Sequence, residues 1–129
     1  MNETQVIIMI KKIVLGLSLM MISLTSSSAG FWHHAGVVTR TLTEGPNYGG
    51  CMIMVSKLLP VQCSVDGKRT NWISLDCQGT YYSDGPRKYA TALAAMTTNL
   101  RVSLWIDDTK KHTGHCVARR MDVYKETTE

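Results

Sequence analysis

Four cysteines, Cys51, Cys63, Cys77 and Cys116, are the residues of this chain whose chemistry is easiest to assign. No two of them form the close Cys-x-x-Cys pair that many structural zinc sites use. An even number of cysteines in a small exported domain predicts disulfide bonds instead. We therefore expect all four to be oxidised to disulfides, with no metal among them.

Other residues that could carry chemistry are few. His112 and His115 lie three positions apart, near Asp107 and Asp108, and could form a surface metal site. Solvated loop side chains are the preferred interpretation, with the two aspartates in a turn. The sequence has no Gly-x-Ser-x-Gly elbow, no His-Glu-x-x-His pair and no phosphate-binding glycine loop. We expect a protein that is not an enzyme and that uses no metal or cofactor.

The N-terminal segment 1–29 predicts export. Two lysines precede the apolar run 13–24, and small residues follow up to Ala29, which is the pattern of a cleavable signal peptide. We expect cleavage after Ala29 and a signal that begins at Met9. Residues 1–8 are surplus to that signal: a translation start at Met9 is the preferred interpretation, and a translated extension is the alternative. A membrane anchor is the alternative, but a spanning helix of about 20 residues would include both lysines. The expected location is secreted or periplasmic, with membrane contact only through the signal peptide.

Residues 30–129 predict one small domain that is mainly β with one helix. Runs rich in β-branched and alternating apolar residues indicate five strands. The expected strands are 36–43, 51–57, 71–77, 101–107 and 115–124, with 61–65 as a further short candidate. Residues 86–98 carry apolar side chains at helical spacing and begin with a proline. The order β-β-β-α-β-β predicts a five-stranded OB-type barrel stapled by disulfides, or else a small open α+β sheet.

Side-chain alternation assigns faces within these elements. In strand 101–107 the alternate apolar residues are expected to enter the core, which leaves Trp105 on the outer face. The expected core-facing stripe of the helix consists of Tyr89, Leu93, Met96 and Leu100. The remaining helix face is made of small residues, which suit close packing on a strand or against a neighbouring subunit. Segment 107–111 is polar and predicts a hairpin turn.

Two disulfide connectivities stay open. The first joins Cys51 to Cys77 and Cys63 to Cys116, and the second joins Cys51 to Cys63 and Cys77 to Cys116. The first follows if strands 51–57 and 71–77 form a hairpin in which Ile53 faces Leu75, because the terminal cysteines then lie opposite each other. The second follows if the partner strand is instead 61–65.

Four aromatic residues beyond those that the predicted core needs are the expected ligand contacts. They are Tyr48, Tyr81, Tyr82 and Trp105. Aromatic rings with polar groups nearby suit sugar stacking, as they suit many protein interfaces. The segment 31–34 is interpreted as a terminal stretch that packs against the sheet.

The domain resembles the B subunits of AB5 toxins, most closely the pertussis-toxin and subtilase-cytotoxin branch. The resemblance rests on Ala35-Gly36-Val37-Val38, Cys51 at the start of a strand, Cys63-Ser64, Trp72 and an alanine-rich helix that leads into a strand. It implies an exported OB-fold subunit that forms pentameric rings, binds cell-surface glycans and partners a toxin A subunit, and it favours a Cys51–Cys63 bridge. The chain departs from this pattern at Ala35, where sialic-acid-binding members have a serine that contacts the sugar.

A second resemblance is to small exported proteins of Gram-negative bacteria, and it favours a Cys63–Cys116 bridge. It rests on Cys63, Trp72-x-x-Leu75-Asp76, Leu93-Ala94-Ala95, Val102 and Cys116.

The expected function is recognition of a cell-surface glycan or receptor by a non-catalytic exported subunit that forms homo-oligomers. A monomeric secreted or periplasmic binding or inhibitor module is the alternative. The net charge of +4 is mild, and no basic stripe interleaved with aromatic residues occurs, so a nucleic-acid partner is not expected.

Overall fold

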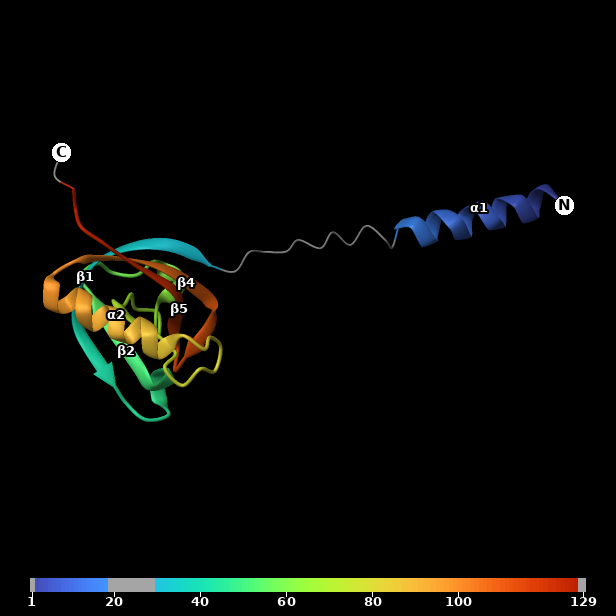
Figure 1. Cartoon of the computed structure of the whole chain (residues 1–129). Helices are drawn as coiled ribbons and strands as arrows, with labels where there is room; N and C mark the ends of the chain where they lie inside the picture. The colour runs from blue at the N-terminus through green and yellow to red at the C-terminus, as the bar shows by residue number, and fades with distance from the viewer. Residues whose placement is uncertain (1, 19–29, 128–129) are drawn as a thin grey trace.

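The computed structural model describes residues 2–18 and 30–127 (Figure 1). Its helices are α1 (Glu3–Ser18) and α2 (Gly85–Thr98), with two short 3₁₀ helices, η1 (Asn47–Gly50) and η2 (Val61–Cys63). Its strands are β1 (Phe31–Thr43), β2 (Cys51–Val55), β3 (Trp72–Ser74), β4 (Arg101–His112) and β5 (His115–Tyr124).

Helix α1 lies within the predicted extension and signal segment. Within residues 2–18 and 30–127, no helix combines the length and apolar character that crossing a membrane requires. The predicted cleavage site after Ala29, and the second half of the predicted apolar run, lie outside the described residues.

The five strands form a closed barrel in the order β1-β2-β3-β5-β4, with α2 between β3 and β4 in the chain (Figure 1). All neighbouring strands are antiparallel except β3 and β5, which are parallel and meet at Ser74 and Val117. This arrangement confirms the predicted disulfide-stapled OB-type barrel and excludes the open sheet. Strand β1 begins at Phe31, five residues before the predicted start, so the segment 31–34 belongs to the barrel wall.

Strand β1 closes the barrel because it pairs with β4 along its first half and with β2 along its second half. The register shifts between His34 and Gly36, where the strand must bend from one partner to the other. Gly36 has a φ of +81°, and a Cβ atom there would lie 2.1 Å from the Ser56 hydroxyl oxygen. Only glycine therefore fits at the point where the wall turns.

The barrel interior is filled by alternate residues of the strands. Val102, Leu104 and Ile106 of β4 are fully buried, as the alternation predicts, and Trp105 faces outward. Ile53 and Val55 of β2 enter the same core.

Both disulfides follow the first of the two open connectivities, Cys51–Cys77 and Cys63–Cys116. The register from which it was argued is wrong by two residues, because Ile53 pairs with Ile73 rather than with Leu75. Strand β3 ends at Ser74, and Cys77 reaches Cys51 from the turn that follows. Bridges of this kind are typical of proteins that fold in an oxidising environment.

Two further assignments are wrong. Segment 61–65 contains the 3₁₀ helix η2 rather than a strand, because Pro60 starts a tight turn that leads into Cys63. Segment 107–111 is not a turn but the continuation of β4, and the hairpin turns at Thr113 and Gly114. Both turn residues have positive φ, which matches the right-handed twist of the flanking strands.

Helix α2 packs on the barrel, mainly against β1, through its smallest side chains. Ala92 and Ala95 are buried against the core, whereas Leu93 and Met96 of the predicted core stripe are exposed. Small side chains allow the helix axis to approach the wall closely, which leaves Leu93 and Met96 outside. Tyr89 and Leu100, the other two members of the predicted stripe, do pack against the core. Asp84 occupies the N-cap position without making a cap hydrogen bond, and its carboxylate pairs with Lys88 at 3.2 Å.

The carboxylate of Asp76 fixes the loop that connects β3 to α2. It is fully buried and accepts hydrogen bonds from the backbone N–H groups of Thr80, Tyr81 and Tyr82, at 2.7–3.1 Å. His112, at the end of β4, donates to it from Nε2 at 2.8 Å. Burial alone would raise the pKa of this carboxyl, but the hydrogen bonds to the charged form outweigh it and the net pKa is lowered.

We predict that Asp76→Asn lowers the free energy of unfolding at pH 7 by about 2–3 kcal/mol, because buried N–H donors lose a charged acceptor. The lowered pKa gives the wild type stability that is present above the ordinary carboxyl value of 3.8 and lost as the pH falls through the lower folded value. The variant should lack this acid-dependent loss. Denaturant unfolding at neutral and acidic pH tests it, with the exposed Asp66→Asn as control. Equal behaviour of the two variants would refute the assigned role.

Candidate functional site

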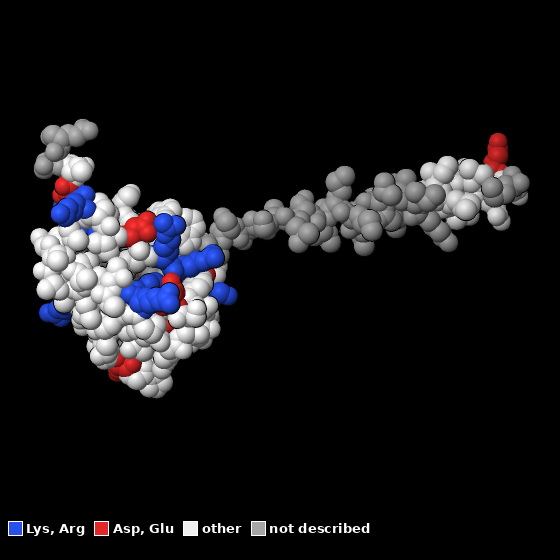
Figure 2. Space-filling view, in the orientation of Figure 1, with Lys and Arg blue, Asp and Glu red and all other residues white. Residues whose placement is uncertain are grey.

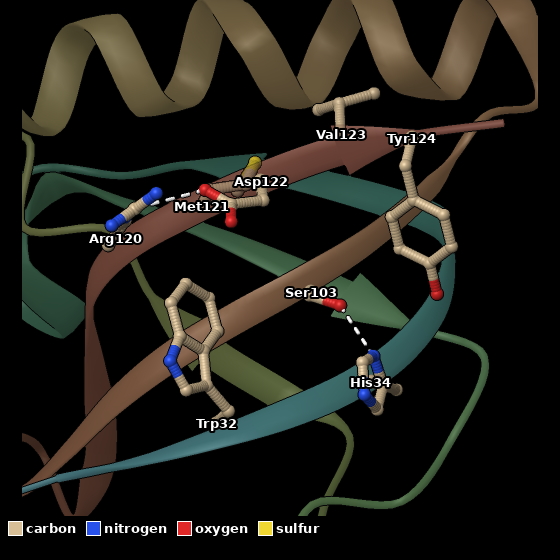
Figure 3. A pocket seen from close by; sticks show the side chains of 8 residues that line it. All are labelled: Trp32, His34, Ser103, Arg120, Met121, Asp122, Val123 and Tyr124. Carbon is tan, nitrogen blue, oxygen red and sulfur yellow. Dashed lines mark hydrogen bonds and ion pairs between the residues drawn. The ribbon is translucent and has the colours of Figure 1, made fainter.

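An open groove runs across the outer face of β1, β4 and β5 (Figure 3). Its volume is about 670 Å³, and it is lined by Trp32, His34, Ser103, Arg120, Met121, Asp122, Val123 and Tyr124. Most of these are alternate residues of three neighbouring strands, so their side chains stand on the same face of the wall.

The pairing of β1, β4 and β5 places the groove residues side by side in two rows across the strands. Trp32 of β1 pairs with Trp105 of β4, which pairs in turn with Arg120 of β5. One step along, His34 pairs with Ser103, which pairs with Asp122.

Two aromatic rings flank the groove. Trp32, 43% exposed, and Tyr124, 37% exposed, stand on opposite sides of the view in Figure 3. Trp32 packs edge-on against Trp105 with ring centroids 5.4 Å apart, and this contact fixes the orientation of the Trp32 indole. Tyr124 packs edge-on against the His34 ring at 6.4 Å.

Polar groups lie between the two rings. His34 Nδ1 and the Ser103 hydroxyl share a hydrogen bond of 2.7 Å. Arg120 Nε donates to Asp122 at 3.0 Å, and the Arg120 guanidinium lies 5.3 Å from the centre of a Trp32 ring. The floor thus offers donors and acceptors to a ligand whose apolar face rests on an aromatic ring.

A smaller hollow of about 330 Å³ continues the groove past Trp32 and is lined by Trp32, Trp105, Arg119 and Arg120. Lys and Arg side chains gather on the face that carries β4 and β5, with carboxylates between them (Figure 2). In the described part of the chain, Arg119 has no carboxylate within ion-pair distance, and its guanidinium lies 5.8 Å from the Tyr82 ring centre.

The four aromatic residues proposed from the sequence do not converge on one site. Trp105 lines the smaller hollow beside the groove, is half-buried and packs edge-on against Trp32. Tyr48 and Tyr81 pack on His115 and His112, beside the β4–β5 turn, with ring centroids 5.4 and 5.0 Å apart.

The contacts of Tyr82 stabilise the fold rather than face a ligand site. Its hydroxyl donates to the Asp107 carboxylate, and Lys88 Nζ lies 5.2 Å from the centre of its ring. Lys88 is itself buried, donates to the Ala118 carbonyl at 2.6 Å, and has its pKa lowered by that burial. Burial, together with the bond to Asp107, raises the pKa of Tyr82 to about 12.

Sequence reasoning did not select Trp32, His34, Arg120, Asp122 and Tyr124 as a site. The signal that could have found them is the period-2 alternation of both β1 and β5, which places each on an outer face. The missing step was to extend the first strand back to Phe31.

The histidines considered as metal ligands are engaged elsewhere: His112 bonds Asp76, and His115 Nδ1 donates to the Thr113 carbonyl at 3.2 Å. Over residues 2–18 and 30–127, no three His, Cys, Asp or Glu side chains form a group that could hold a metal ion.

Comparisons with known proteins add no relative. No family model, no curated protein and no solved structure matches the chain.

We predict that one of the five tyrosines ionises near pH 12 and that Tyr82→Phe removes this late titration. Because the folded pKa is raised, the Tyr82–Asp107 bond stabilises the fold fully below pH 10, and its contribution is lost as the pH rises towards 12. We expect Tyr82→Phe to cost about 1–2 kcal/mol at pH 7. Absorbance titration and denaturant unfolding measure both effects.

Tyr81→Phe is the matched control, since the Tyr81 hydroxyl makes only an exposed bond of 3.3 Å to the Lys111 carbonyl. A Tyr82→Phe protein with the stability and titration of the wild type would contradict the assignment.

Proposed function

We propose that the protein is an exported, non-catalytic binding module and that the groove of Figure 3 takes a sugar residue of a cell-surface glycan or glycosylated receptor. The observation that carries the proposal is the pairing of two exposed aromatic rings, Trp32 and Tyr124, with four polar side chains between them. The C–H face of a sugar packs on such rings, while its hydroxyl groups need donors and acceptors beside them.

Several further features support binding rather than catalysis. The groove is open, its polar groups pair with one another, and its walls are rigid strands of a closed barrel. Neither Asp76 nor Asp107 faces this groove, because both carboxylates are buried in structural hydrogen bonds. Two disulfides support a place of action in an oxidising compartment, which fits secretion or the periplasm.

A toxin B-subunit role is the more specific form of this proposal. The OB-type barrel supports it, and the exposed Leu93 and Met96 on α2 offer apolar surface for a homo-oligomeric ring. Ala35 is fully buried in β1, so we do not propose sugar contact at that position.

A monomeric secreted or periplasmic binding module is the second candidate. The observation that favours it is that Trp32, Tyr124 and the polar groups between them come from three neighbouring strands of the same barrel. Light scattering of the exported protein distinguishes a ring from a monomer. An adjacent gene for an enzymatic A subunit would favour the toxin form.

We predict that Trp32→Ala and Tyr124→Ala each weaken binding to the best glycan on an array by about tenfold, because each removes one stacking face. Tyr81→Ala is the matched control, since Tyr81 is exposed to a similar degree, 39%, but lies beside the β4–β5 turn. The control should bind as the wild type does.

Two results would overturn the proposal. One is an array on which the folded, oxidised protein binds no glycan. The other is glycan binding that survives loss of both Trp32 and Tyr124.

A further inference from the structure

Another hollow lies on the outer face of β2 and β3, away from both the groove and the smaller hollow that continues it. Its volume is about 290 Å³, and it is lined by Leu42, Glu44, Tyr48, Met52, Trp72 and His115. None of these residues lines the groove of Figure 3. It is therefore an independent candidate for ligand binding.

Three of the six side chains that line this hollow carry aromatic rings. Tyr48 and His115 pack edge-to-face, with centroids 5.4 Å apart and planes at 82°, and the half-buried Trp72 adds a third ring. Met52 lies between Cys51 and Ile53, which enter the core, so its side chain is on the outer face. It is nevertheless only 2% exposed, because the residues around it cover it.

The charge of the lining is negative. Glu44 supplies the only carboxylate, and no lysine or arginine lines the hollow. Across the described ranges, the Glu44 side chain has no ion pair. Burial lowers the pKa of His115, so its ring adds no positive charge at neutral pH.

The backbone under Tyr48 is held in place. Tyr48 and Gly49 both have positive φ, 58° and 73°, and the Ser74 hydroxyl donates to the Tyr48 carbonyl at 2.7 Å. A Cβ atom on Gly49 would lie 2.6 Å from a carbon of the His112 ring, so only glycine fits there. Left-handed backbone at a non-glycine residue costs free energy, so it persists only where the surrounding structure holds it in place.

We propose that this hollow binds an organic cation, specifically a quaternary or methylated ammonium group. The electron-rich faces of aromatic rings attract such a cation, and its methyl groups fit an apolar wall. Glu44 at the rim supplies the opposite charge. The proposal is independent of glycan binding, because the two surfaces share no lining residue.

The test is a titration of the full-length, oxidised protein with choline, followed by the indole N–H resonances of the three tryptophans. We expect the Trp72 resonance to shift, while those of Trp32 and Trp105 stay in place. The neutral isostere 3,3-dimethylbutan-1-ol has the same shape without the charge. It should bind about tenfold more weakly, since a neutral ligand gains neither the cation–π attraction nor the Coulomb attraction to Glu44.

Three variants test the residues. Glu44→Gln should weaken choline binding several-fold, whereas Glu126→Gln, on a carboxylate paired with Arg101 at 2.7 Å, should not. Tyr48→Phe should retain binding and Tyr48→Leu should lose it, because the ring face and not the hydroxyl contacts the cation. Unchanged Trp32 and Trp105 resonances in each free variant report an intact fold, because neither residue lines this hollow.

Equal affinity for choline and the neutral alcohol would show an ordinary apolar pocket and overturn the proposal. So would a shift at Trp32 or Trp105 instead of Trp72, or the absence of any shift.

Discussion

The buried carboxylate of Asp76 is the interaction on which the arrangement of this domain depends. A charge inside a small barrel is tolerated only where donors surround it, and three consecutive backbone N–H groups and His112 meet that need. The same bonds set the path of the chain from β3 into α2 and tie it to the far end of β4. One side chain thus links the loop that leads into the helix to the β4–β5 hairpin.

A closed barrel has two surfaces, and its inner one is fully used by packing. The hollows described above therefore lie on the outer face, where they form two regions of different chemistry. Across β1, β4 and β5, aromatic rings alternate with paired polar groups and arginines. Over β2 and β3, aromatic rings meet a single carboxylate. The protein could engage two unlike ligands without rearranging its core.

The sequence was sufficient for the architecture but not for its details, and the reasons are physical. Alternation assigned the β4 faces correctly, yet a two-residue change of register keeps every side chain on its face, so the pattern could not separate Ile73 from Leu75 as the partner of Ile53. The polar segment 107–111 resembled a turn because the exposed part of the hairpin arm, 109–111, needs no apolar side chains. Asp107 is buried, but its hydrogen bonds to Tyr82 and Thr109 satisfy it without an apolar side chain. The role of Asp76 depends on His112, 36 positions away, and no local pattern reports such a contact. Three strands contribute residues to the groove, so no single stretch of the sequence indicates it.

Because β1 begins at Phe31, the residues of the outer face near its start depend on where the N-terminal segment is cleaved. Gly30 sits against the Trp105 indole, where an added Cβ atom would be 2.5 Å from Nε1, and Trp32 follows two residues later. Cleavage after Ala29, as the sequence predicts, would leave almost no spare chain ahead of the barrel wall. Removal of even a few more residues would then delete Trp32 from the groove and break part of the β1–β4 pairing that closes the barrel. The position of the expected peptidase cut would thus decide whether the groove keeps its Trp32 ring.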